Sequence, residues 1–373
     1  MRVLVTGLGT FWGTRVAQEL ERDPNVEMVV GLDSQDPVLP LERTEFVKAD
    51  SSYSILSRIV QATEVDTIIH AHLCVDSTEI SGRALHELNV IGTMNLLAAA
   101  GTAGSTVRKV VVRSSTLVYG SNYNDPAFFR EETPRSRPAR TRVERSLLEV
   151  SRFLREFAAD NPHVNLTKLR FSNVLGEDMD TPITNMLQLP LMPEIFGFDP
   201  RLQFVHQDDV IGAMLYATLA EVPGVYNVAG DGIVTWSEIA RMARKNRIAM
   251  PPILTNWALE PMRLLRILDI PPEVEALLRY GRIADNRRYK SAGYRYRYTT
   301  VGTVESYLRS LRLTAAVGDP RPEYRYESAV ETFFRHSPAV RRKPINARRR
   351  RDDMRTPSAE IIDVSASRPG NPE

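Results

Sequence analysis

The chain has little cysteine and no long apolar run, and both absences narrow its class. Cys74 is the single cysteine among 373 residues, so a disulfide within the chain is excluded and a reducing compartment is favoured. No apolar stretch reaches the roughly 18–20 residues that span a bilayer, and no charged-then-apolar leader precedes the first predicted strand. We therefore expect a cytoplasmic protein that is not anchored in a membrane.

A large excess of charge of one sign is also absent, because 48 Lys and Arg stand against 46 Asp and Glu. The balance is uneven along the chain. Residues 341–355 hold eight Lys or Arg and two Asp, which leaves the rest of the chain with a net charge of about −4. A folded domain that binds nucleic acid has the opposite distribution, so we expect no nucleic-acid partner.

The first 33 residues have the order that a dinucleotide site requires. An apolar run at 2–6 is followed by Gly7, Gly9 and Gly13, a helical pattern, and a second apolar run that leads to Asp33. Glycines at such a turn let the backbone approach a pyrophosphate, whose charge meets the N-terminus of the helix. A carboxylate at the end of the second strand accepts hydrogen bonds from ribose hydroxyls and repels a 2′-phosphate. The pattern predicts an NAD site, with a plain tight turn as the alternative.

Strand-like and helix-like patterns alternate through the first half of the chain. Helical periodicity lies near 54–63, 83–103 and 141–159. Such alternation indicates a parallel sheet covered on both faces. Apolar runs predict strands at 2–6, 26–32, 46–50, 66–71, 109–113, 166–171 and 224–229.

The chain also changes character twice along its length. From about residue 176 the segments are shorter and richer in proline, and a capping box at 235–238 begins a further helix. Past about residue 337 the chain is rich in Arg, Pro and Ser with little apolar periodicity. We predict a Rossmann-type, doubly wound α/β domain over 1–175 and a basic, disordered tail over 337–373. Between them, residues 176–336 are expected to form a smaller and irregular substrate-binding lobe, from which some of the chain crosses back to the sheet.

Further motifs follow one another in the order of a known family. They are Thr6-Gly7 with Gly13, Asp33, Asp50, His70-Ala71-His72, Asn89 to Thr93, Ser114 to Gly120, Arg170 to Gly176, Phe204 to His206 with Asp208-Asp209-Val210, and Tyr226 to Ala229. Over about residues 1–315 the chain resembles the NAD-dependent epimerase/dehydratase branch of the extended short-chain dehydrogenase/reductase family, which includes UDP-glucose 4-epimerase. The resemblance implies NAD as cofactor, a nucleotide-sugar substrate, and a possible homodimer formed through the helices at 83–103 and 141–159.

The resemblance also assigns roles to individual residues. Asp50 is expected at the adenine edge and Asn89 near the nicotinamide half, between the fourth and fifth strands. Ser115 ends the fifth strand, where its hydroxyl would stabilise charge on the reacting oxygen of the substrate, and Asn173 would bind the substrate. The cofactor residues implied are Gly7, Gly9, Thr10, Phe11, Trp12, Gly13, Asp33, Ser34, Asp50, Ser51, Ala71, His72, Leu73, Asn89 and Phe171.

The pair of residues that carries the family's acid–base chemistry is missing. The family uses a tyrosine four residues before a lysine, whose charge lowers the tyrosine pKa. No Tyr-x-x-x-Lys occurs in the chain. Counting back from Glu149 places Thr141 at the tyrosine and Arg145 at the lysine. Threonine has no titration near neutral pH, and arginine keeps the charge with a different geometry, so Thr141 and Arg145 join Ser115 as atypical catalytic candidates.

Three other features bear on this site. Thr10 stands where the family has its middle glycine, and bulky Trp12 lies beside it. The arginines between 135 and 145 are either an anion-binding wall or a solvated basic turn. His70, His72 and Cys74 alternate as metal ligands on a strand would, but we interpret them as packing residues and expect no metal.

Three functional hypotheses remain open. The first is an NAD-dependent sugar-nucleotide epimerase or dehydratase with a rearranged acid and base, in which Tyr119, Tyr123 or a histidine replaces the missing tyrosine. The second is a catalytically inactive NAD-binding module that acts as a sensor or scaffold. The third is a structural or regulatory subunit that keeps the fold without a ligand.

Overall fold

The computed structural model describes residues 1–76, 81–251 and 270–317. Its centre is a seven-stranded sheet in the order β3-β2-β1-β4-β5-β6-β11, and every neighbouring pair is parallel. The strand order reverses between β1 and β4, where open α/β sheets form their ligand crevice. The strands are β1 (Arg2–Thr6), β2 (Met28–Asp33), β3 (Glu45–Lys48), β4 (Thr67–His70), β5 (Lys109–Ser115), β6 (Asn165–Phe171) and β11 (Gly224–Val228).

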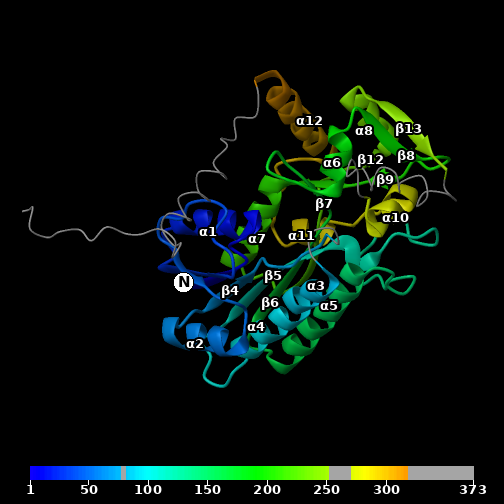
Figure 1. The fold of residues 1–373 in the computed structure, drawn as a ribbon. Coiled ribbons are helices and arrows are strands. Elements are labelled where there is room, and N and C mark those ends of the chain that lie inside the picture. The colour runs from blue at the N-terminus through cyan, green and yellow to red at the C-terminus, as the bar shows by residue number, and fades with distance from the viewer. Residues whose placement is uncertain (77–80, 252–269, 318–373) are drawn as a thin grey trace, which may run out of the picture. The chain divides into compact units, whose positions relative to one another are not determined.

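Helices cover both faces of this sheet, which confirms the predicted Rossmann-type, doubly wound fold. Figure 1 shows α1 and α7 on one side and α2, α4 and α5 on the other. Alternate residues of one strand enter the two cores, so that Val111 packs with α1 and α7 while Val110 and Val112 pack with α2, α4 and α5. These helices are α1 (Phe11–Arg22), α2 (Tyr53–Thr63), α4 (Gly92–Ala100), α5 (Arg142–Asp160) and α7 (Gln207–Leu219).

The predicted continuous helix at 83–103 is interrupted in the structure. A short α3 (Gly82–His86) leads into a π-helical turn, η1 (Glu87–Ile91), before α4 begins. The amide of Gly92 donates to the carbonyl of Glu87, five residues earlier, and the hydroxyl of Thr93 donates to the carbonyl of Asn89 at 2.5 Å. A single wide turn of this kind is frequent at functional sites.

The second half of the chain adds small sheets and helices around a third core, which contains Phe204, Trp236 and Tyr307. Three two-stranded sheets pair β7 with β10, β9 with β12 and β8 with β13. η2 (Thr116–Tyr119) follows β5 directly, and the other described elements are β7 (Asn173–Leu175), α6 (Pro182–Gln188), β8 (Leu191–Ile195), β9 (Arg201–Leu202), β10 (Phe204–His206), β12 (Val234–Thr235), α8 (Trp236–Ala243), β13 (Asn246–Met250), α10 (Pro272–Tyr280), α11 (Arg287–Ser291) and α12 (Thr300–Val317).

Residues Met1–Ala316 form one compact unit. After β6 the chain forms β7 in a separate small sheet, and it returns to the large sheet through α7 and β11. The boundary between domains at residue 175 remains a prediction, and the tail predicted at 337–373 lies outside the described residues. Within the part of the chain that the structure describes, no helix is both long and apolar enough to cross a membrane.

Candidate dinucleotide and substrate site

The glycine turn between β1 and α1 depends on the absence of side chains. Gly7 has a φ of +88°, and its amide donates to the carbonyl of Leu32 at 3.1 Å. A Cβ on Gly13 would lie 2.2 Å from the carbonyl oxygen of Gly7. The turn therefore excludes side chains at these positions, and it leads directly into the N-terminus of α1, the kind of helix end that attracts phosphate.

Thr10, the residue at the family's glycine position, is part of this turn. It caps α1: its hydroxyl donates to the carbonyl of Gly7 at 2.7 Å and accepts from the amide of Gly13 at 3.3 Å. The hydroxyl thus bonds to the loop itself, and the substitution of the glycine is accommodated by a helix cap.

Asp33 lies at the end of β2 with a side chain that is 2% exposed. One carboxylate oxygen accepts the amide of Gly9 at 2.9 Å and the other accepts the amide of Gln35 at 3.0 Å. A Cβ on Gly9 would lie 3.2 Å from the carboxylate carbon, so the glycine permits this close approach. His72 Nδ1 is 3.9 Å from the same carboxylate, and burial lowers the pKa of His72 although Asp33 opposes the shift.

The remaining adenosine-side candidates lie near the ends of β2 and β3. The Ser34 hydroxyl is 3.5 Å from Asp33 Oδ1, and Ser51 holds the side chain of Asn95 through its carbonyl at 2.9 Å. Asp50 is exposed and accepts the amide of Ser52 at 3.4 Å.

Trp12 and Arg113 lie against each other at the end of β5. The guanidinium carbon of Arg113 is 4.9 Å from the centre of the Trp12 ring, and Phe11 meets that ring edge-on at 5.2 Å. Arg113 also donates to the carbonyl of Leu73 at 3.1 Å. Sequence reasoning missed Arg113, although a charged residue inside the apolar run 109–113 was a visible signal.

Asn89 fixes the segment that follows β4. Its amide group forms two bonds of 2.8 Å with the backbone of Cys74, one through each end, and a third of 3.1 Å to the hydroxyl of Ser146 on α5. Ala71, His72 and Leu73, the predicted neighbours of the cofactor, lie in the segment that this clamp holds.

The candidates for substrate chemistry meet at the ends of β5 and β6. Ser115 is paired in register with Phe171, and its hydroxyl accepts the amide of Leu117 at 3.1 Å. Asn173 begins β7, and its side chain donates to the carbonyl of Gln203 at 3.1 Å. The carboxyl ends of the two strands thus bring Ser115, Phe171 and Asn173 to one edge of the sheet, where ligands bind in such folds.

Thr141 and Arg145 lie in the first turns of α5 in different settings. Thr141 is the N-cap in a capping box, because its hydroxyl accepts the amide of Glu144 at 3.2 Å and Glu144 accepts the amide of Thr141 at 3.2 Å. Arg145 is exposed. The Thr141 hydroxyl, which we predicted at the tyrosine position, is therefore engaged in capping the helix.

The arginines between 135 and 145 occupy separate surroundings. Arg135 has a side chain that is 10% exposed, pairs with Glu144 at 2.8 Å, and donates to the carbonyls of Val118 and Arg137. Arg137 lies over the exposed ring of Tyr123 at 4.7 Å. Arg135 is thus a structural link between η2 and α5.

His70 lies in the core with both ring nitrogens engaged. Nδ1 is 2.8 Å from the hydroxyl of Thr6, and Nε2 is 3.0 Å from the hydroxyl of Thr93. Burial lowers the pKa of His70 to about 3, so the ring is neutral at physiological pH. Residues 1–76, 81–251 and 270–317 contain no cluster of three His, Cys, Asp or Glu suited to a metal ion.

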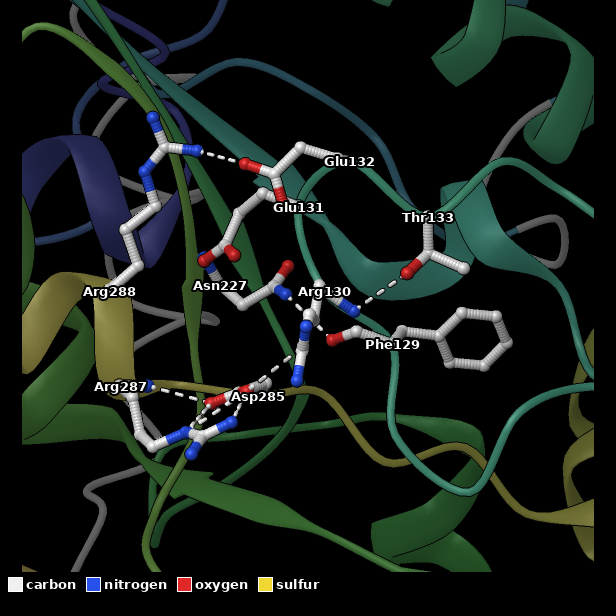
Figure 2. A network of polar contacts seen from close by, with 9 residues as sticks. All are labelled: Phe129, Arg130, Glu131, Glu132, Thr133, Asn227, Asp285, Arg287 and Arg288. Atoms are coloured by element: carbon white, nitrogen blue, oxygen red, sulfur yellow. Dashed lines mark hydrogen bonds and ion pairs between the residues drawn. The ribbon is translucent and has the colours of Figure 1, made fainter.

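Tyr119, one candidate to replace the missing tyrosine, is buried, and its hydroxyl contacts β6 and β11. Its hydroxyl donates to Asn227 at 2.8 Å and accepts from Arg170 at 2.7 Å, and burial raises its pKa. Asn227 belongs to the polar network of Figure 2, which joins the segment 129–133 to 285–288. A phenol with a raised pKa is a poor base at neutral pH.

Comparisons with known proteins agree with this geometry. The family model described as "NAD dependent epimerase/dehydratase family" matches residues 3–229. Uncharacterized proteins of Mycobacterium tuberculosis (strain ATCC 25618 / H37Rv) and Mycobacterium bovis are each 36% identical over 326 residues, which are 85% of this chain and 86% of theirs.

Solved structures share the fold at lower identity. UDP-glucose 4-epimerase of Thermotoga maritima, solved with UDP-glucose, has a TM-score of 0.65 at 18% identity and covers 84% of this chain and 100% of its own. UDP-glucuronic acid 4-epimerase of Bacillus cereus, solved with NAD, has a TM-score of 0.62 at 17% identity and covers 84% and 99%. From the extent of the family match and the 36% identity, the chain belongs to the NAD-dependent epimerase/dehydratase family.

Proposed function

We propose that the protein is an NAD-dependent enzyme that acts on a nucleotide sugar, as an epimerase or dehydratase with an atypical active site. The observation that carries this proposal is the buried Asp33 carboxylate, which is held by Gly9 beside a turn that excludes side chains at Gly7 and Gly13. Family membership supports it, and so does the pairing of Ser115 with Phe171, two residues before Asn173, at the strand ends.

Different residues along the edge of the sheet bind the cofactor and the substrate. Asp33 accepts hydrogen bonds from the adenosine ribose, and the first amides of α1 face the pyrophosphate. NAD supplies a hydride acceptor when it is bound. Ser115 donates a hydrogen bond to the reacting oxygen of the sugar and stabilises charge that develops there, and Asn173 helps to bind the nucleotide sugar.

A second candidate is an NAD-binding module without catalysis. The Thr141 hydroxyl is engaged in a helix cap, and burial raises the pKa of Tyr119. Neither group is therefore suited to take a proton at neutral pH. The lack of a suitable base among these two groups favours a sensor or scaffold role if the protein is not an enzyme.

Two measurements on the purified protein separate the candidates. Calorimetry with NAD tests the cofactor site, and incubation with NAD and a panel of UDP- and dTDP-sugars, followed by mass spectrometry and NMR, tests turnover. Binding together with epimerised or dehydrated product supports the enzyme. Binding without product supports the module, and the absence of NAD binding contradicts both.

The double variant Thr141→Tyr with Arg145→Lys restores the missing pair. Gain of turnover in this variant would show that the scaffold still aligns a nucleotide sugar with NAD. Thr141→Phe with Arg145→Lys is the matched control, because it has the same bulk without the phenol.

A further inference from the structure

Arg282 lies beside the edge of the sheet that carries Ser115, although the two residues are far apart in sequence. Its side chain reaches the segment directly after Ser115, where Nε is 3.3 Å from the hydroxyl of Thr116 and one terminal nitrogen is 3.4 Å from the hydroxyl of Ser121. The residue is 8% exposed, and its backbone bridges to Leu202 of β9. A buried guanidinium thus sits next to the proposed oxyanion donor.

The backbone around Arg282 is tied to Asn173. The side-chain oxygen of Gln203 accepts the amide of Ala284 at 2.9 Å, and the carbonyl of Gln203 accepts the side chain of Asn173 at 3.1 Å. The same residue therefore links the segment that carries Arg282 to the start of β7. These contacts place Arg282, Asn173 and Ser115 around one region.

The partners of Arg282 leave its charge without a direct counter-ion. Within the described parts of the chain both of its hydrogen bonds go to hydroxyls, and no carboxylate lies within ion-pair distance. Glu144 acts on it from further away and is itself paired with Arg135; Asp125 and Glu273 also act at longer range. Burial lowers the pKa of Arg282 to about 10, so it stays charged at neutral pH.

A buried charge normally has an ion partner, because removal from water is costly. Arg135 follows this rule through Glu144, whereas Arg282 follows it only if a ligand supplies the negative charge. Guanidinium groups match carboxylate and phosphate oxygens in pairs.

We propose that Arg282 binds an anionic oxygen pair of the substrate beside Ser115. A nucleotide sugar offers two such groups, a phosphate of its diphosphate or a carboxylate on a uronic acid sugar. This assignment rests on the proposed function and adds a residue that determines the substrate's charge. It places the positive charge of the site on Arg282, while Arg145 on α5 is exposed.

The test compares Arg282→Met and Arg282→Lys with the wild type, and uses Arg135→Met as the structural control. Calorimetry in the presence of NAD measures binding of UDP, UDP-glucose and UDP-glucuronic acid, and thermal melting is recorded without ligand. We expect Arg282→Met to melt at or above the wild-type temperature, because it loses an uncompensated buried charge. Arg135→Met should melt lower, because it leaves Glu144 buried and unpaired.

Arg282→Met should weaken ligand binding at least about tenfold, which is about 1.4 kcal/mol, with Arg282→Lys in between and NAD affinity within about twofold of wild type. Weaker binding of UDP-glucuronic acid alone assigns the carboxylate, and equal weakening of all three ligands assigns the phosphate. Unchanged binding of all three overturns the proposal, as does a melting temperature that falls as far as that of Arg135→Met.

Two small anions separate this proposal from the proposed function. If the wild type binds no nucleotide ligand, inorganic pyrophosphate and glucuronate are tested by the same calorimetry. Binding of either anion that is lost in Arg282→Met supports the anion site while the nucleotide-sugar function fails. No binding of either anion to the wild type contradicts both proposals.

Discussion

At the scale of single residues, the site depends on polar groups that are buried at strand ends. Asp33 receives two backbone amides, and His70 has a threonine hydroxyl at each ring nitrogen. Sequence position alone predicted Asp33, since a carboxylate after the second strand is a local signal. The partners of His70 and the environment of Arg113 were not predictable, because they come from strands and helices far apart in sequence.

Replacement of Asp33 should weaken NAD binding. Asp33→Ala removes the proposed acceptor of the ribose hydroxyls and frees the amide of Gly9. A hydrogen bond to a charged group is worth about 1.5–3 kcal/mol, so we expect the Kd to rise by at least tenfold in calorimetry. Asp36→Ala is the control, because Asp36 is exposed and pairs with Lys48 at the surface. Equal affinity of Asp33→Ala and the wild type would contradict the cofactor assignment.

His70 should make the protein sensitive to acid. Its pKa is lowered to about 3 in the folded state from 6.5, so the unfolded state binds more protons between these values. Stability contributed by the neutral ring is complete above about pH 6.5 and is lost as the pH falls toward 3, by up to about 1.4 kcal/mol per pH unit. Denaturant melts between pH 4 and 7 give the free energy of unfolding at each pH. This free energy should change less steeply with pH in His70→Gln than in the wild type, while His163→Gln, which alters an exposed histidine, should keep the wild-type dependence on pH.

At the scale of elements, periodicity predicted the strands of the large sheet to within a few residues, whereas most of the short elements after β6 were not predicted. The run at 109–113 became β5, and the helix at 141–159 became α5 with its apolar stripe in the core. The helix at 83–103 differed, because the wide turn at Asn89 is held by Cys74 and Ser146. Local spacing contains no information about those contacts, so an unbroken helix was the expected pattern.

The capping box at the start of α5 predicts that the Thr141 hydroxyl contributes to stability, whether or not it has a catalytic role. Thr141→Ala should lower the free energy of unfolding by about 1 kcal/mol, because the cap of the Glu144 amide is lost. Thr141→Ser keeps the hydroxyl and should be nearly neutral in chemical denaturation. If Thr141→Ala is as stable as Thr141→Ser, the cap does not contribute as the geometry indicates.

At the scale of the whole molecule, the second half of the chain is joined to the sheet by contacts between distant segments. The amide of Phe129 donates to the carbonyl of Ile283, and the carbonyl of Phe129 accepts the amide of Asp285. Glu131 accepts the amide of Asn227 on β11 at 2.8 Å, and Figure 2 shows both residues. Such links span about 100 residues or more. The sequence predicted a second lobe from its composition, but its attachment could not be predicted, since hydrogen bonds between irregular segments leave no periodic signal.

Glu131 allows this attachment to be tested by pH. Burial raises its pKa above 4.5, so the folded state binds more protons than the unfolded state between the two values, and the cost of its charge is present above the folded pKa and disappears as the pH falls toward 4.5. Glu131→Gln keeps an acceptor for the Asn227 amide without the charge. We expect it to melt at or above the wild-type temperature at pH 7.5, with a smaller difference at pH 5.

Glu132→Gln is the matched control for this variant, because Glu132 is exposed and pairs with Arg288 at the surface. An exposed ion pair contributes little, so the control should melt close to the wild type at both pH values. If Glu131→Gln melts below Glu132→Gln at pH 7.5, the carboxylate contributes more to joining the two halves than its burial costs. The charge of Glu131 would then be part of what holds the second half of the chain on the sheet.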